Sequence, residues 1–224
     1  MRTSPSVQKL YTSQTLDLRV VSRIKVYSTK ILNLFKPKQK IYARQCNVIE
    51  VSSKQADVFL NEYHLQGTCR GQLLILGLVY NDELVSLMSF GKSRYNSNYE
   101  WELLRLCSHT DYQVVGGASK LFKYAINLNK FNSLISYCDL AKFEGDVYKH
   151  IGMMWKTSTP PQEIWSKSTN YITANLLRSR GYDQLFGTNY GKGTSNDQLM
   201  LEHGWLPVYD CGQDVYTWIS EKVN

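Results

Sequence analysis

The segment Gln113-Val114-Val115-Gly116-Gly117-Ala118-Ser119-Lys120 constrains the fold of this 224-residue chain more than any other feature. It follows an apolar stretch at 99–107 and opens a stretch at 116–129 whose apolar residues recur with helical spacing. Two adjacent glycines permit a tight turn and a close approach of a ligand to the backbone. Because the first N–H groups of a helix are unpaired and favour anions, the segment predicts a strand–turn–helix unit that binds a diphosphate. All of its residues except Val114 are candidate contacts, and the alternative is a tight connection that binds nothing.

Apolar stretches of two periodicities surround this unit. Those typical of strands lie at 42–51, 73–80, 84–90, 99–107, 134–139 and 153–158, and those typical of helices at 53–63 and 145–151. Their order predicts a mixed α/β fold with a mixed sheet. Beyond Pro160-Pro161 we expect a helix at 172–180, a glycine-rich stretch at 181–193 and a terminal hairpin at 204–218 that closes the sheet.

The positive charge is concentrated at the amino-terminal end. Residues 1–45 carry ten Lys or Arg and one acid, Asp17, so that this part alone exceeds the chain's net charge of +7. We therefore divide the chain into a basic arm at 1–44 that is partly flexible or helical, a core at 45–160 and an extension at 161–224 that packs on the core. A basic arm is typical of a partner with a phosphate backbone; the alternative is a solvated tail. The candidate DNA contacts are Arg23, Lys25, Lys36, Lys38, Lys40, Arg44, Arg70 and Arg94.

Two further patterns concern location and cysteine chemistry. No apolar run approaches the roughly 18 residues of a membrane span, and residues 1–30 lack the apolar stretch of a signal peptide. We expect a cytoplasmic protein without a membrane partner. The five cysteines are odd in number and have no C-x-x-C spacing, which favours free thiols over a disulfide framework or a zinc site.

Two motifs resemble the signatures of one enzyme superfamily. Gln113 to Ala118, after a strand, resembles the coenzyme A pyrophosphate loop of GNAT acyltransferases, and Val147-Tyr148-Lys149-His150-Ile151-Gly152-Met153 resembles the second signature of that family. The resemblance covers residues 48–158. It implies a GNAT-like fold and an acyl-CoA donor, such as acetyl-CoA, for an N-acyltransferase reaction.

Narrower resemblances point to DNA. The segments 63–67, 102–106, 136–139 and 145–152 are similar in order to motifs of phage Mom proteins, which modify adenine in DNA. The same segments, with 40–46 and 209–212, resemble the carboxy-terminal domain of phage Hef-like homing endonucleases, here without an acidic nuclease domain because residues 1–39 hold one acid. These resemblances imply Mom-like modification of a base, in the host cytoplasm if the chain is phage-encoded. The alternative is a non-catalytic DNA-binding module.

Four residues are catalytic candidates. Tyr148 matches the usual acid of the GNAT family, and Asp139 matches an aspartate of Mom-like sequences that holds or deprotonates an exocyclic amine. Glu102 is a second candidate base, and His64 is a candidate base, a stacking partner or, with Asp139, a metal ligand. Successive residues of a strand face opposite sides. Because Glu102 and Arg105 are three positions apart, we expect them to face different surfaces. Core packing, capping or ion pairing is the alternative role for each.

Overall fold

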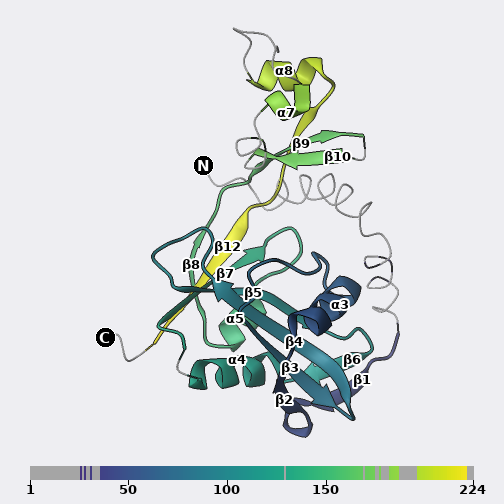
Figure 1. Ribbon diagram of the computed structural model, residues 1–224, viewed down its shortest axis with the longest axis vertical. Coiled ribbons are helices and arrows are strands. Elements are labelled where there is room, and N and C mark those ends of the chain that lie inside the picture. Colours follow the sequence, from purple (N-terminus) through teal and green to yellow (C-terminus); the bar gives the residue numbers. More distant parts are fainter. Residues whose placement is uncertain are drawn as a thin grey trace. The chain divides into compact units, whose positions relative to one another are not determined.

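The computed structural model describes residues 36–128, 130–168, 170–174, 182–186 and 196–220, and the single positions 26, 28, 31 and 177. The chain forms two compact units (Figure 1). One unit comprises Arg23–Cys138, Glu144–Thr157 and Asp214–Asn224, and the other comprises Met1–Ser22, Asp139–Phe143 and Ser158–Gln213. Most of the basic arm, with the candidate contacts Arg23 and Lys25, lies outside the described residues.

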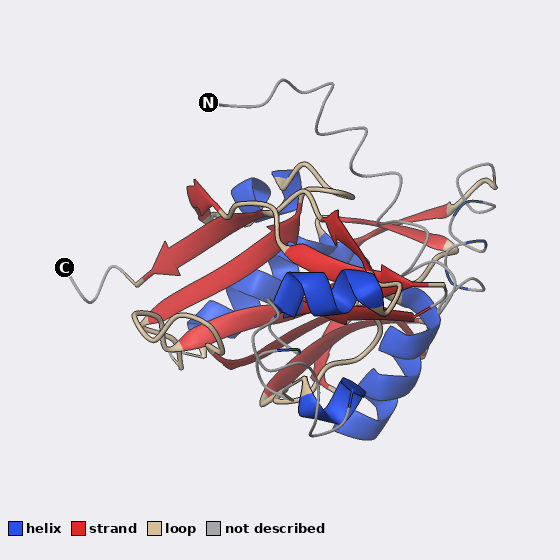
Figure 2. Cartoon of the chain, turned by 90° about the horizontal axis from the view of Figure 1, so that it is seen from above, coloured by secondary structure: helices blue, strands red, loops and turns tan. Residues whose placement is uncertain are grey.

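A seven-stranded sheet forms the centre of the first unit, with the strand order β2-β3-β4-β5-β7-β12-β8. The strands β2 to β5 pair in antiparallel fashion, and β5 pairs with β7 in parallel. Helices and strands are both present (Figure 2), so the mixed α/β fold class is confirmed. The bounds are β2 Asn47–Glu50, β3 Leu74–Tyr80, β4 Glu83–Lys92, β5 Trp101–Ser108, β7 Ser133–Asp139, β8 Met154–Ser158 and β12 Gln213–Ile219.

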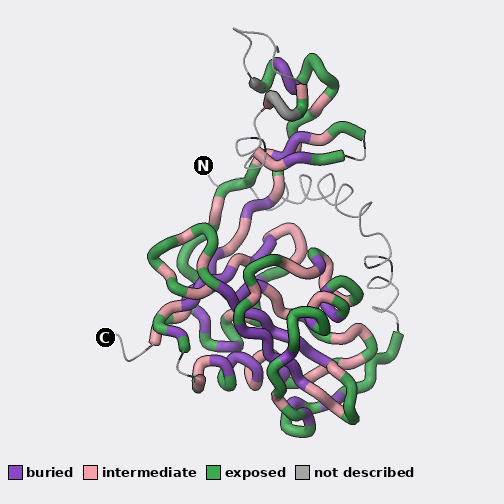
Figure 3. Tube along the Cα trace, viewed as in Figure 1, coloured by how far each residue is buried: buried purple, intermediate pink, exposed green. Residues whose placement is uncertain are grey.

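Two helices cover opposite faces of this sheet. Along β3, Leu74, Leu76 and Leu78 pack in one cluster with residues of α4 (Gly117–Asn127), whereas Ile75 packs in another with residues of α3 (Ser53–Tyr63). This division follows from the alternation of side chains along a strand. The central strands are accordingly the most continuously buried part of the chain (Figure 3).

Local sequence signals explain several element ends. Ser52 and Gln55 form a capping box at the start of α3, each side chain bonding the backbone of the other. Asn81 and Asp82 both have positive φ, at 48° and 63°, which suits the two-residue turn that joins β3 to β4. A short helix, α5 (Asp146–His150), begins after Gly145.

A second, two-stranded sheet joins distant parts of the same unit. The strand β1 (Gln39–Tyr42) pairs in parallel with β6 (Tyr112–Val115) over four residue pairs. A 3₁₀ turn, η1 (Ala43–Gln45), follows β1. The predicted strand at 42–51 is therefore wrong over 43–46, because the chain turns there before it enters the central sheet.

The other unit contains a three-stranded sheet in the order β10-β9-β11. Its strands are β9 Glu163–Lys167, β10 Asn170–Thr173 and β11 Leu206–Tyr209, and its helices α7 Asp183–Phe186 and α8 Asn196–Glu202. The buried side chains of Trp165, Ile172, Leu177 and Met200 form its core.

Two sequence predictions in the carboxy-terminal part need correction. The predicted helix at 172–180 is wrong at 172 and 173, because Ile172 pairs with Trp165 across β10 and β9. Positions 174 and 177 are helical, and the others of this range lie outside the described residues. The predicted terminal hairpin at 204–218 is also wrong, since β11 pairs with β9 and β12 belongs to the seven-stranded sheet. The strand β10 pairs with the strand just before it in the chain, whereas β11 and β12 pair with strands from more distant parts of the chain.

Candidate active site

The turn between β6 and α4 has an open backbone. Gly116 has a φ of +76°, the left-handed conformation that side chains rarely adopt, and it precedes the first residue of α4. Gly117 has a different role, because a Cβ there would lie 2.9 Å from Cγ1 of Val114. Val115 and Gly116 are exposed. The first N–H groups of α4, which have no partner within a helix, therefore begin at a solvent-accessible turn.

The ammonium of Lys120 is held by the backbone of the 3₁₀ turn. Its Nζ donates hydrogen bonds to the carbonyl oxygens of Ala43 at 3.0 Å and Cys46 at 2.6 Å. Lys120 thus joins α4 to η1, and its direct contact with a phosphate stays a prediction.

A basic strip lies beside the turn. In the parallel register Tyr42 is opposite Val115, the residue that precedes Gly116. The cationic groups of Lys40 and Arg44 lie 5.7 Å and 5.0 Å from the centre of the exposed Tyr42 ring. Sequence analysis identified these two cations as arm residues but missed their position next to the turn. No sequence signal pairs two strands that lie about seventy positions apart.

The strands β5 and β7 pair only at their beginnings. Two register pairs join them, Trp101 with Leu134 and Glu102 with Ile135. One residue further on, the hydroxyl of Ser136 donates to the carbonyl of Leu103 at 3.0 Å, so a side chain replaces the next backbone bond. The sheet therefore loosens between these two parallel strands. Of the two, β5 precedes β6 and the turn at Gly116 along the chain.

Tyr148 lies on α5 and packs against this part of the unit. Its ring stacks on Tyr216 with centroids 4.8 Å apart, and its hydroxyl donates to the carbonyl of Tyr137 at 3.5 Å. Burial raises the pKa of Tyr148 to about 12. The phenol therefore stays protonated at neutral pH, as a proton donor requires.

A β-bulge at Leu104 changes the sides of the sheet to which the side chains of Glu102 and Arg105 point. In the β4–β5 register Phe90 is opposite Leu103 and Ser89 opposite Arg105, so Leu104 is the additional residue. Arg105 consequently lies within electrostatic range of both Glu102 and Tyr148. The expectation that Glu102 and Arg105 face different surfaces is wrong, because one inserted residue restores a common side.

The carboxylate of Glu102 is buried and paired with Arg94. Glu102 is 2% exposed, and its Oε1 accepts from Nη2 of Arg94 at 2.5 Å while its Oε2 accepts from the Arg94 backbone N–H at 3.1 Å. The pairing raises the pKa of the Arg94 guanidinium. Arg105 has a different environment: it donates to the carbonyls of Gly67 and Leu104, and burial lowers its pKa. Arg105 is a candidate that sequence analysis left out of the site.

Asp139 ends β7 and belongs to the other unit. Its carboxylate pairs with the ammonium of Lys142 and accepts from the backbone N–H of Ala141 at 3.0 Å. These contacts shape the turn after β7. His64, the residue that caps the end of α3, accepts at Nδ1 from the N–H of Gln66 at 3.0 Å.

The remaining predicted DNA contacts that the structure describes are at the surface. Lys36, Lys38, Lys40, Arg44 and Arg70 are exposed.

Within the described ranges, no group of three or more His, Cys, Asp or Glu residues is placed to hold a metal ion. In the same part of the chain, no helix has the length and apolar character needed to cross a membrane. None of the five cysteines, all of which lie within the described residues, forms a disulfide.

Comparison with known proteins gives structural likenesses only. No family model matches the chain, and no curated protein matches it. An acetyltransferase of Bacillus subtilis in complex with CoA is similar with a TM-score of 0.44 and 10% identity, over 78% of this chain and 99% of that chain. The ribosomal-protein-S18-alanine N-acetyltransferase from Escherichia coli is similar with a TM-score of 0.45 and 10% identity, over 78% and 93%.

A third solved structure is a GNAT family acetyltransferase from Elizabethkingia anophelis with acetyl-CoA bound. It is similar with a TM-score of 0.40 and 12% identity, over 79% of this chain and 99% of that chain. The function of this chain is therefore inferred from its own residues.

Proposed function

We propose that this chain is a GNAT-type N-acyltransferase that uses an acyl-CoA donor. The observation that carries the proposal is the exposed left-handed turn at Gly116, which opens α4 beside the cations of Lys40 and Arg44. Backbone N–H groups at a helix start, together with nearby cations, form a site for a diphosphate. The amides of Gly117 to Ser119 would hold the diphosphate of the donor, and Lys40 and Arg44 would neutralise it.

The loosened junction of β5 and β7 suits the rest of such a donor. An extended amide chain needs backbone partners, and the two strands exchange only two register pairs before Ser136 takes over. When bound, the donor supplies an activated thioester carbonyl. The amino group of the acceptor attacks that carbonyl, and the thiol of coenzyme A leaves.

Protein side chains then accept one proton and donate another. The attacking nitrogen loses one proton, and Glu102 is the candidate in this unit for the base that receives it. The departing sulfur gains the other, and the protonated hydroxyl of Tyr148 is the candidate donor because burial keeps it neutral. Arg94 donates to both carboxylate oxygens of Glu102, so protonation of Glu102 competes with this pairing.

Calorimetric titration with acetyl-CoA and with CoA tests the donor site. We expect saturable binding that weakens about tenfold when Lys40 and Arg44 are both changed to Ala, because two charge-assisted contacts are lost. The double substitution of Lys123 and Lys130 to Ala is the matched control for charge, since both are exposed and neither belongs to β1, η1 or the turn at Gly116. Absence of acetyl-CoA binding to the folded wild-type chain would refute the proposal.

We further propose that the acceptor is an amino group on a DNA base. Arg94 lies 5.4 Å from the centre of the Tyr95 ring, and Tyr95 contacts Tyr137 edge-on with centroids 6.1 Å apart. Tyr95 is 73% exposed. An exposed ring next to a guanidinium suits a flipped or single-stranded base, and the exposed cations of Lys36 and Lys38, ahead of β1, suit the phosphate backbone.

Mass spectrometry of nucleosides from DNA co-expressed with this chain tests the acceptor. We expect an acylated base with the wild type and its loss with Tyr148→Phe. Salt-dependent DNA binding that survives Tyr148→Phe, without any modified base and without an effect of acetyl-CoA, would replace this proposal by the non-catalytic DNA-binding module.

A further inference from the structure

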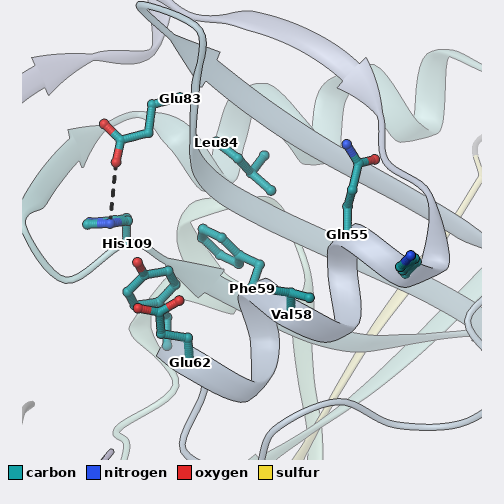
Figure 4. Close-up of a pocket in the computed structure, with 9 residues that line it drawn as sticks. Gln55, Val58, Phe59, Glu62, Glu83, Leu84 and His109 are labelled. Carbon is teal, nitrogen blue, oxygen red and sulfur yellow. Dashed lines mark ion pairs between the residues drawn. The ribbon is translucent and has the colours of Figure 1, made fainter.

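A separate hollow lies on the α3 face of the central sheet. It has a volume of about 430 Å³ and is lined by side chains of α3, by the turn end of β4 and by His109, which follows β5. Figure 4 shows Glu62, Glu83 and His109 gathered at one end and Gln55 at the other. The buried ring of Phe59 and the half-buried Leu84 supply apolar surface between the two ends.

The charged end of the hollow is built from aromatic rings. The centroid of Tyr63 lies 4.3 Å from that of His109 and 4.8 Å from that of Phe59. His109 in turn contacts Tyr112 at 5.3 Å. Aromatic faces attract cations because their π electrons carry negative charge above the ring.

The contacts around His109 fix the position of Glu83 at this end. Nδ1 of His109 accepts from the backbone N–H of Asp111 at 3.1 Å, so in the neutral imidazole Nε2 carries the proton. This Nε2 faces Oε1 of Glu83 at 3.4 Å, and Oε2 of Glu83 accepts from the hydroxyl of Tyr112 at 2.5 Å. The two contacts, from His109 and from Tyr112, hold the carboxylate of Glu83 in position at this end of the hollow.

The surrounding charges make the end of the hollow negative. The pKa of Tyr63 is raised to about 12, first by burial and then by Glu62, Asp111 and Glu83. Lys54 is the cation among the lining residues, but it precedes Glu62 by eight positions, or about 12 Å along the axis of α3. A negative, ring-lined end on a chain with a net charge of +7 is a local reversal of sign.

We propose that this hollow binds a primary aliphatic amine. The ammonium lies against the carboxylates of Glu62 and Glu83 and the rings of Tyr63 and His109, and the alkyl chain runs over Phe59 and Leu84 towards Gln55. The site is on the face of the sheet opposite α4, and it does not depend on the proposed acyl-CoA site.

Two-dimensional ¹H–¹⁵N NMR of the full chain, titrated with hexylamine and with 1-hexanol at pH 7.5, tests this site. The two probes have the same alkyl chain and differ in charge. We expect saturable shift changes at the amides of Tyr63, Leu84 and His109 with hexylamine, and affinity for 1-hexanol at least about fivefold lower. Equal affinity for both probes, or shift changes that avoid these residues, would overturn the proposal.

Matched variants assign the charge. Glu62→Gln should weaken hexylamine binding about threefold to fivefold, the range for a partly exposed ion pair, and Glu83→Gln should weaken it by a similar factor. Glu50→Gln, an exposed residue of β2 outside the hollow, changes the net charge equally and should leave the affinity unaltered. Glu62 is exposed and outside the bonds that fix His109, so its variant stays informative if Glu83→Gln disturbs the fold. Unchanged affinity in Glu62→Gln, or equal weakening by Glu50→Gln, contradicts the assignment.

Discussion

Replacing Lys120 by Met separates a structural role of this lysine from a ligand-binding role. The substitution keeps the length of the side chain and removes the ammonium that bonds the carbonyl oxygens of Ala43 and Cys46 at 3.0 Å and 2.6 Å. A hydrogen bond from a charged donor contributes about 1.5–3 kcal/mol. The two bonds share one ammonium and Lys120 is only half-buried, so the expected loss in the free energy of unfolding is about 2–3 kcal/mol.

Urea denaturation of the wild type, Lys120→Met and Lys123→Met measures this loss. Lys123 is on the same helix and exposed, so its variant should change the free energy of unfolding by no more than about 0.5 kcal/mol. The midpoint for Lys120→Met should fall while the slope with urea stays the same. If the two variants are equally stable and only Lys120→Met loses affinity for acetyl-CoA, the bonds to Ala43 and Cys46 do not hold α4 to η1 and the lysine is a phosphate ligand.

Three further outcomes follow from contacts in the same unit. Tyr148→Phe should lower the rate of acyl transfer about a hundredfold. The pKa of Tyr148 is about 12 in the folded chain against an ordinary value of 10, so the wild type should also lose stability as the pH rises from 10 through 12. The thermal unfolding midpoint across this pH range should fall less in the variant. Gly145→Ala should cost about 2–4 kcal/mol in urea denaturation, because φ is +79° and the new Cβ would lie 2.1 Å from the hydroxyl of Tyr216; an unchanged midpoint would contradict that geometry. Arg94→Met should lower the free energy of unfolding by about 2 kcal/mol, because Glu102 stays buried without its partner. The loss is smaller than for a fully buried pair because the Arg94 side chain is 38% exposed. A double-mutant cycle with Glu102→Gln that shows no coupling would disprove the pairing.

Elements whose ends depend on nearby residues are the ones that a single sequence can predict. The cap at Ser52, the turn at Asn81 and Asp82, and the two glycines at the start of α4 all act within a few positions of the chain. The helix expected at 53–63 and the strand expected at 134–139 accordingly agree with α3 and β7 to within one residue.

Features that depend on distant pairing could not be predicted in the same way. The bulge at Leu104 is visible only in the register between β4 and β5, and it brings Arg105 to the side of Glu102. The hollow at His109 could not be predicted from the sequence for a similar reason. Its lining comes from α3, from the start of β4 and from the residue after β5. A single sequence without pairing information contains no period or motif that joins these three places.

The parallel pairing of β1 with β6 has a thermodynamic consequence for the amino-terminal arm. Since Tyr42 is opposite Val115, an anion that touches both the amides of α4 and Arg44 is bound in full only while β1 is docked. Linkage then requires the two equilibria to strengthen each other by the same free energy. Saturation of the turn with a diphosphate should slow amide exchange in β1, and undocking of β1 should weaken binding of the anion by the same free energy.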